Sequence, residues 1–233
     1  MRNYLMFADT DLRDYGVYIS GSGVFNAPER QYDEIAVPGR NGNILSHEKR
    51  LSNIEITYPA FIYKDFKQNI SGLKAFLISK VGYQKLIDTY NPTEYRKAYY
   101  AGGMDIEPTS KLDAGQFDLV FKCMPQRFLL SGDTVTSYTE SGTLNNITMF
   151  TALPLIRAYG TGSFTVNDVT VTITAADVYT DIDCELMDAY KGVYPKNDCI
   201  QLSGNDFPSL KPGENTITLN GVTLDITPRW WTV

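Results

Sequence analysis

Apolar and polar residues alternate along much of this chain, which is the pattern of half-buried β-strands. The clearest stretch is Asn53–Tyr58, where every second side chain is large and apolar. A second is Phe117–Cys123, in which Phe117, Leu119, Phe121 and Cys123 share one face. In the first half of the chain, the pattern predicts strands over residues 15–20, 32–37, 53–58, 83–88, 94–100 and 117–123.

One segment departs from this period. Large apolar residues recur there at helical spacing, at Phe66, Ile70, Leu73, Phe76 and Leu77. The spacing predicts an amphipathic helix from Asp65 to Val81. Asp65 suits the N-terminal cap and Gly82 the C-terminal end.

Residues 125–133 mark a boundary, because no helical stripe follows them. Asn220–Gly221, between two alternating stretches, is a strong hairpin signal. Short strands separated by turn residues predict a sandwich or jelly roll. The fold class is therefore mainly β, with an α+β unit over residues 1–130 and an all-β unit over 131–225. The expected strands of the second unit are 134–138, 153–158, 163–166, 169–174, 178–186, 199–202, 215–219 and 222–226.

Composition narrows the function. The chain has 233 residues, 43% of them hydrophobic, and a net charge of −6 with no run of Lys and Arg. That excludes a domain that grips duplex DNA, which needs a basic footprint, and with it sequence-specific nucleic-acid binding. An acidic chain is compatible with a channel through which DNA slides, because like charges discourage adhesion of phosphate.

Apolar segments and cysteines bear on where in the cell the protein is located. The apolar stretch at the start is too short for a signal peptide, and no window is long enough to span a bilayer. We therefore expect no membrane insertion, and a protein that stays in the cytoplasm at least until it assembles. The odd set Cys123, Cys184 and Cys199 predicts free, mostly buried thiols in a reducing compartment.

Catalytic chemistry finds little support. The only histidine, His47, lies in a charged, turn-like stretch, and no nucleophile elbow accompanies it. Clustered zinc ligands and a glycine loop opening a helix are also lacking. We expect no enzyme, no metal and no cofactor, and we interpret His47 as a solvated loop residue.

The sharpest acidic cluster is Asp181, Asp183 and Glu185, which share one face of a predicted strand. Paired carboxylates could hydrolyse a glycoside or hold Ca²⁺. The favoured interpretation is a strand with its charged face in water. Tyr179, Tyr190 and Tyr194 could stack sugars or bases, but strand aromatics more often fill a core or an interface.

Both tryptophans, Trp230 and Trp231, lie within the last four residues of the chain. A terminus normally frays, so this apolar area should be docked. Neighbours in a strand point to opposite faces, so one side chain can fill the core. The other then faces a second domain or another chain.

Several motifs occur together in a recognisable order. The first half contains Tyr15-Gly16-Val17, Val37-Pro38-Gly39-Arg40-Asn41-Gly42 and Asp88-Thr89-Tyr90-Asn91-Pro92 with Tyr95-Arg96. The second half contains Ala152-Leu153-Pro154-Leu155-Ile156, Ile182-Asp183-Cys184-Glu185, Gly204-Asn205-Asp206-Phe207-Pro208 and Pro228-Arg229-Trp230-Trp231. Over nearly its whole length, the chain resembles the distal tail protein (Dit) family of siphophages and prophages.

The resemblance implies a structural protein of the virion tail tip that forms a hexameric ring around a channel for DNA. Its partners are the tail-tube protein, the C-terminus of the tape-measure protein and the tail-associated fibre or lysin protein. It implies a ring-forming first domain, like a β-barrel or sandwich with one helix, and an outer galectin-like or carbohydrate-module-like sandwich. The last strand, near residues 226–233, would pack back on the first domain. Candidate docking residues within the motifs are Arg40, Tyr95, Arg96, Arg229, Trp230 and Trp231.

Two other functions stay open at this point. The second sandwich could be a carbohydrate-binding module that grips cell-surface glycans, with Asp181, Asp183 and Glu185 as a weak glycan or ion face. A glycosidase using those carboxylates is a remoter alternative, because a separated carboxylate pair is not evident.

Overall fold

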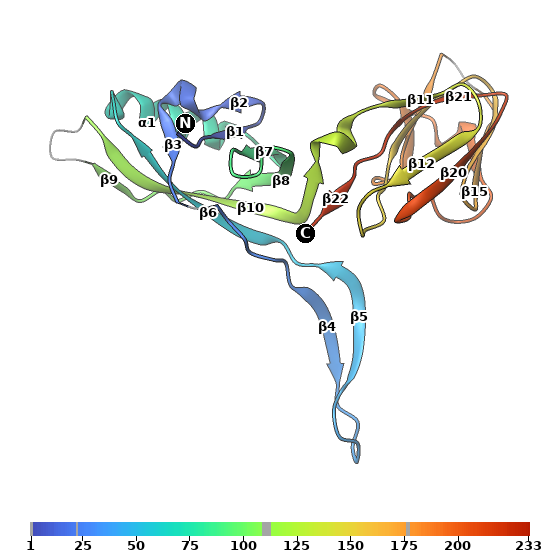
Figure 1. The fold of residues 1–233 in the computed structure, drawn as a ribbon, viewed down its shortest axis with the longest axis horizontal. Coiled ribbons are helices and arrows are strands. Elements are labelled where there is room, and N and C mark those ends of the chain that lie inside the picture. The colour runs from blue at the N-terminus through green and yellow to red at the C-terminus, as the bar shows by residue number, and fades with distance from the viewer. Residues whose placement is uncertain (1, 22, 109–112, 176–177) are drawn as a thin grey trace. The chain divides into compact units, whose positions relative to one another are not determined.

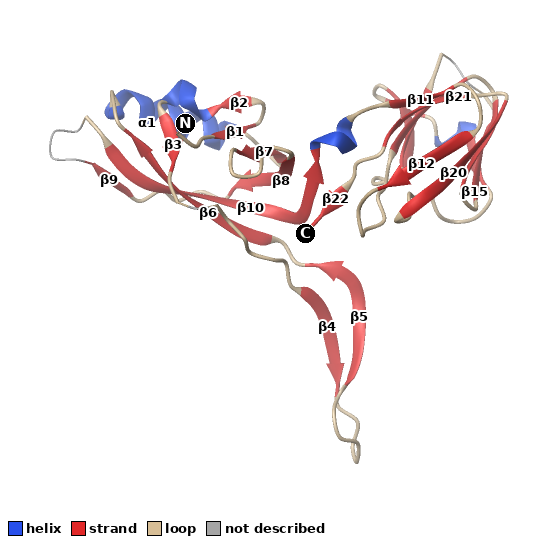
Figure 2. Ribbon diagram, viewed as in Figure 1, coloured by secondary structure: helices blue, strands red, loops and turns tan. Residues whose placement is uncertain are grey.

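The computed structural model describes residues 2–21, 23–108, 113–175 and 178–233, without the side chains of residues 47–49. The chain divides into two compact units, the first running to Arg127 and including Val233, the second covering Phe128–Thr232. The fold is mainly β, as the alternation predicted (Figure 2). The described residues contain one α-helix and three short 3-10 helices.

A sheet of nine strands runs through the first unit, in the order β2-β1-β7-β8-β10-β6-β3, with β9 also paired to β10. Its ninth strand, β22 (Trp231–Thr232), also pairs with β10 and belongs to the second unit, as do the last two residues of β10, Phe128 and Leu129. Figure 1 shows β6 and β10 running side by side, and their antiparallel register extends from Gly115–Ile62 to Cys123–Ile54. A separate two-stranded ribbon pairs β4 with β5. The bounds are β1 (Leu5–Phe7), β2 (Thr10–Asp11), β3 (Val17–Ile19), β4 (Arg30–Ile35), β5 (Ile44–Leu51), β6 (Ile54–Ile62), β7 (Gln84–Asp88), β8 (Glu94–Tyr100), β9 (Ile106–Pro108) and β10 (Gly115–Leu129).

Helix α1 (Phe66–Ser79) covers one face of this sheet, close to the predicted bounds. It buries Phe66, Ile70, Leu73 and Leu77 against the strand residues of the first core. Asp65 occupies the N-cap position, as predicted, with φ of 49°. Its side chain makes no capping hydrogen bond, so only its backbone takes part in the start of the helix. The alternation predicted for β6 and β10 is confirmed, since their inward faces are buried.

The second unit is a sandwich of two antiparallel sheets, ordered β11-β21-β13-β16-β17-β18 and β12-β20-β14-β15-β19. Ile156, Ile182 and Ile226 from one sheet pack with Phe164 and Ile217 from the other in a single core. The bounds are β11 (Thr136–Tyr138), β12 (Gly142–Asn146), β13 (Leu155–Tyr159), β14 (Gly162–Val166), β15 (Val169–Ile173), β16 (Thr180–Asp183), β17 (Asp188–Lys191), β18 (Tyr194–Pro195), β19 (Ile200–Leu202), β20 (Gly213–Asn220), β21 (Thr223–Thr227) and β22 (Trp231–Thr232).

Two predictions about elements are wrong. The strand expected over 178–186 ends at Asp183, where the chain turns into β17. The turn-like stretch around His47 is strand β5, in which His47 lies opposite Tyr32. The His47 side chain lies outside the described residues. No helix among the described residues has the length and apolarity needed to cross a bilayer.

Candidate functional site

The β4–β5 arm, residues 30–51, carries a concentration of exposed apolar side chains in the first unit. Leu45 is 57% exposed and Ile35 51%, and Tyr32, Val37 and Ile44 are also exposed. Among the described residues, β4 and β5 pair only with each other, so both outer edges are open. A lone hairpin is marginally stable in water, and open apolar edges invite pairing with another chain. The arm is therefore the strongest candidate for an assembly surface.

The turn at the tip of the arm explains why the hairpin forms. Gly39 and Gly42 have φ of 80° and 81°, a conformation that other residues adopt only with strain. The Arg40 amide donates to the Val37 carbonyl at 3.2 Å, and the Asn43 side chain donates to Glu34 at 2.7 Å. Arg40, one of the candidate docking residues, is exposed at this tip.

Two other candidates, Tyr95 and Arg96, are buried inside the first unit. Burial lowers the pKa of Arg96, although Cys123, Tyr58 and Asp88 favour its charged form. The Tyr58 hydroxyl donates to Asp88 at 2.9 Å, and burial first, then the Asp88 charge, raises the Tyr58 pKa well above its ordinary value. Both residues thus have internal packing roles, and their use in docking stays a prediction.

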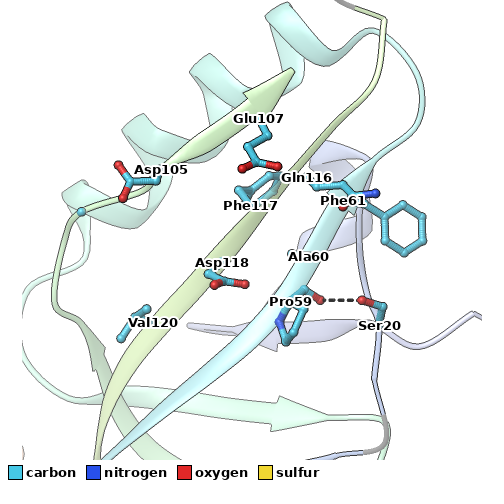
Figure 3. Close-up of a pocket in the computed structure, with 11 residues that line it drawn as sticks. Ser20, Pro59, Ala60, Phe61, Asp105, Glu107, Gln116, Phe117, Asp118 and Val120 are labelled. Atoms are coloured by element: carbon cyan, nitrogen blue, oxygen red, sulfur yellow. Dashed lines mark hydrogen bonds between the residues drawn. The ribbon is translucent and has the colours of Figure 1, made fainter. Parts of the chain in front are cut away.

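An acidic hollow of about 850 Å³ lies on the exposed face of β6 and β10 (Figure 3). The carboxylates of Asp105, Glu107 and Asp118 line it beside Phe61 and Pro59. No ion pair joins these three carboxylates to a cation among the residues described. An antiparallel sheet often keeps one face in water, and this face would repel phosphate rather than hold it.

The C-terminal tryptophans have different environments. Trp230 is 5% exposed and belongs to the core of the second unit, with its carbonyl accepting from the Leu129 amide at 2.8 Å. Trp231 is half-buried, stacks on Phe150 at 4.3 Å between ring centres, and donates from Nε1 to the Thr151 carbonyl at 2.9 Å. These contacts lie within the second unit, and packing of residues 226–233 on the first unit stays a prediction.

The interpretation of the acidic strand as a face in water is wrong for Asp181 and Asp183, which are almost completely buried. Arg157 donates to both oxygens of Asp181 at 2.6 and 2.9 Å. Arg229 donates to Asp183 and, at 3.4 Å, to Glu185. A buried aspartate is tolerated only when it is paired, so these carboxylates act as internal anchors. Sequence reasoning missed both arginine partners, because they are distant in the chain.

The described part of the chain contains neither a metal-binding cluster nor a reactive thiol in its two buried cysteines, Cys123 and Cys184. No group of three or more His, Cys, Asp or Glu side chains there is arranged to hold an ion. Among the described residues, Cys123, Cys184 and Cys199 form no disulfide. Burial raises the pKa of Cys123 and of Cys184 to about 12, so neither thiol is a ready nucleophile.

Comparison with known proteins finds a family model that matches within the first unit. Residues 10–123 match the model of the phage tail protein RIFT-related domain. The matched region contains both the β4–β5 arm and helix α1. A comparison with curated proteins finds no match.

The whole chain shares its fold with a solved phage structure. The Dit protein (gp 19.1) of SPP1 matches with a TM-score of 0.77 and 15% identity, covering 100% of both chains. That protein is described as a paradigm of the hub adsorption apparatus in phages that infect Gram-positive bacteria. The resemblance to siphophage distal tail proteins, inferred from the order of sequence motifs, is confirmed by these two findings. The carbohydrate-binding alternative gains no support from them.

Proposed function

We propose that this protein is a structural distal tail protein of a siphophage or prophage, which assembles into a hexameric ring at the virion tail tip. The ring joins the tail tube to the tail-associated fibre or lysin protein, contacts the tape-measure C-terminus and leaves a channel for DNA. Residues 1–130 build the ring, and residues 131–225 form an outer sandwich. The full-length likeness to a phage hub protein carries this proposal.

The β4–β5 arm supplies a physical reason for assembly. Its open edges and exposed apolar residues are unfavourable in an isolated chain. Burial against a neighbouring copy removes that cost, and a head-to-tail contact of arm on neighbour repeats around a closed ring. The channel, in turn, needs walls that do not hold DNA. The net charge of −6 and the acidic hollow meet that need.

The proposed activity is mechanical, without an enzyme's reacting group, cofactor or membrane anchor. Asp181 and Asp183 are committed to ion pairs with arginines, so a catalytic role would require their release. A buried pair of this kind is costly to break. We therefore propose that the protein works through the surfaces it offers to its own copies and to neighbouring tail parts, after assembly in the host cytoplasm.

The test is the quaternary state of the purified chain, measured by light scattering after size exclusion and by electron microscopy. We expect a hexamer whose population rises with concentration. Leu45→Lys should shift the population to monomers, because it removes apolar surface from the arm. The hairpin itself should persist, because the new lysine lies opposite Glu34 in the register. Ile78→Lys, at an exposed position on α1, is the matched control and should leave the hexamer intact.

Binding assays extend the test to the other tail parts. The chain should retain the tail-tube protein and the fibre or lysin protein in a pull-down. A chain that stays monomeric at every concentration and retains neither partner would overturn the proposal.

A further inference from the structure

The chain contains two Asn-Gly pairs, and the structure gives them different surroundings. Asn41-Gly42 lies at the tip of the β4–β5 arm, and Asn220-Gly221 joins β20 to β21. Both asparagines are exposed, and both glycines have φ of 81°. The exposure of the asparagines and the φ of the glycines are thus matched, whereas the restraint on each turn differs.

The Asn220 turn is held on several sides. Asn220 lies opposite Ser163 in the sheet, and its side chain donates to the Ser163 hydroxyl at 3.3 Å. A Cβ built at Gly162 would approach the Asn220 carbonyl oxygen to 2.3 Å, so the two backbones are in close contact. A Cβ built at Gly221 would lie 3.2 Å from the Thr161 carbonyl oxygen, which is tight but less so.

The Asn41 turn has none of these restraints. A Cβ built at Gly42 would meet nothing within 4 Å. In the described part of the chain, no hydrogen bond holds the Asn41 side chain or the Gly42 amide. The hydrogen bonds of this turn belong to its neighbours, Arg40 and Asn43. Exposed loop tips with small residues are also where local opening costs least.

We propose that Asn41 is a site of spontaneous deamidation, and that Asn220 is protected by its fold. The backbone nitrogen of Gly42 attacks the side-chain carbonyl carbon of Asn41, so that a carbon–nitrogen bond forms and the bond to the side-chain nitrogen breaks. Ammonia leaves with the proton from Gly42, and a cyclic succinimide remains. Water then opens the ring to aspartate or isoaspartate, with no change of oxidation state.

The product changes the tip of the arm in two ways. It places a carboxylate next to Arg40, and isoaspartate also inserts an extra methylene into the backbone of the turn. If the arm binds a neighbouring copy, which rests on the proposed function, aged protein should assemble less well than fresh protein. The modification itself does not depend on assembly.

The test follows deamidation at both sites in the full chain, incubated folded and in denaturant at mildly alkaline pH. Chymotryptic peptides are separated and sequenced by mass spectrometry, and each folded rate is divided by the unfolded rate at the same site. We expect this ratio to be about tenfold higher at Asn41 than at Asn220. A single hydrogen bond that must break before the ring closes slows the reaction by about this factor, and the Asn41 turn lacks one. Asn41→Gln should abolish the signal from the arm peptide, because a six-membered ring closes much more slowly.

Equal ratios at the two sites, or a higher ratio at Asn220, would overturn the proposal. This outcome is separate from a failure of the proposed function. Peptide masses report the modification in a monomer as well as in a ring, whereas light scattering reports only the ring.

Discussion

Arg229 donates two hydrogen bonds to Asp183, at 2.7 and 2.8 Å, across 46 positions of the chain. The pair ties the segment that carries both tryptophans to the end of β16. Arg229 adopts φ of 58°, a left-handed conformation that a non-glycine residue enters at a cost. The ion pair and the Arg229 amide, which donates to the Gly132 carbonyl at 2.8 Å, offset that cost.

The first prediction concerns removal of this charge pair. Asp183→Asn should lower the free energy of unfolding by about 3 kcal/mol, because it leaves the half-buried Arg229 guanidinium with only its longer contact to Glu185. Urea unfolding followed by circular dichroism measures the change. Asp168→Asn breaks the exposed Lys211–Asp168 pair and should have almost no effect. Similar losses from both substitutions would contradict the assignment of Asp183 as an anchor.

The second prediction is a dependence of stability on acid. Burial alone would raise the Asp183 pKa, but hydrogen bonds and charge from Arg229, with the Leu186 and Glu185 amides, hold it below the ordinary 3.8. A carboxyl with a lowered folded pKa stabilises the fold above its unfolded value, and that contribution is lost as pH falls through the folded value. Unfolding free energies measured from pH about 5 to about 2 should therefore decline more steeply for the wild type than for Asp183→Asn. Parallel curves would refute the linkage.

The third prediction separates the two tryptophans. Trp230→Ala should cost about 3–5 kcal/mol, since Trp230 fills the core of the second unit. Trp231→Ala should cost less, about 1–2 kcal/mol, because it loses the stack on Phe150 and one hydrogen bond. Thermal and urea unfolding give both values. Trp231→Phe, which keeps an aromatic ring for Phe150, should recover part of the smaller loss. A larger loss at Trp231 would reverse the assignment.

The sequence predicted the elements whose burial repeats with a regular period. Helix α1 and the inward faces of β6 and β10 follow directly from their apolar spacing. Strand β5 was missed because none of the described side chains of the arm is buried, so no period-two pattern of apolar residues marks the strand. The pairing of Asp183 with Arg229 was also missed, because alternation within one strand carries no information about a partner 46 residues away.

The environment of a candidate site residue could be predicted only where it depends on neighbours in the sequence. Adjacent tryptophans predicted one ring in the core, and Trp230 lies there. The other ring was expected to face a second domain or another chain, and for Trp231 this stays a prediction. Tyr95 and Arg96 were predicted to be docking residues because they lie in a family-like motif, but the fold buries both side chains. Local sequence could not show this, because their burial depends on how β8 lies in a nine-stranded sheet.

The fourth prediction concerns thiol reactivity. Cys123 and Cys184 are buried with pKa values raised to about 12, whereas Cys199 is only half-buried. The thiolate is the reactive form, so a disulfide reagent should label one thiol in the folded protein and all three in denaturant. Cys199→Ser should remove the fast phase alone. Fast labelling that persists in this variant would show that one of the two cores opens readily.

The last prediction tests how closely the C-terminal segment packs. A Cβ at Gly132 would approach the backbone nitrogen of Trp230 to 2.3 Å, a contact that no side-chain rotation relieves. Gly132→Ala should therefore displace the segment and cost about 2–3 kcal/mol. Urea unfolding gives the loss, and Trp230 fluorescence should move toward that of a solvated ring. Gly204→Ala is the matched control, because its added Cβ meets nothing within 4 Å. If Gly132→Ala were as stable as Gly204→Ala, the segment would have to be free to shift, and the Arg229–Asp183 pair could not be fixing its position.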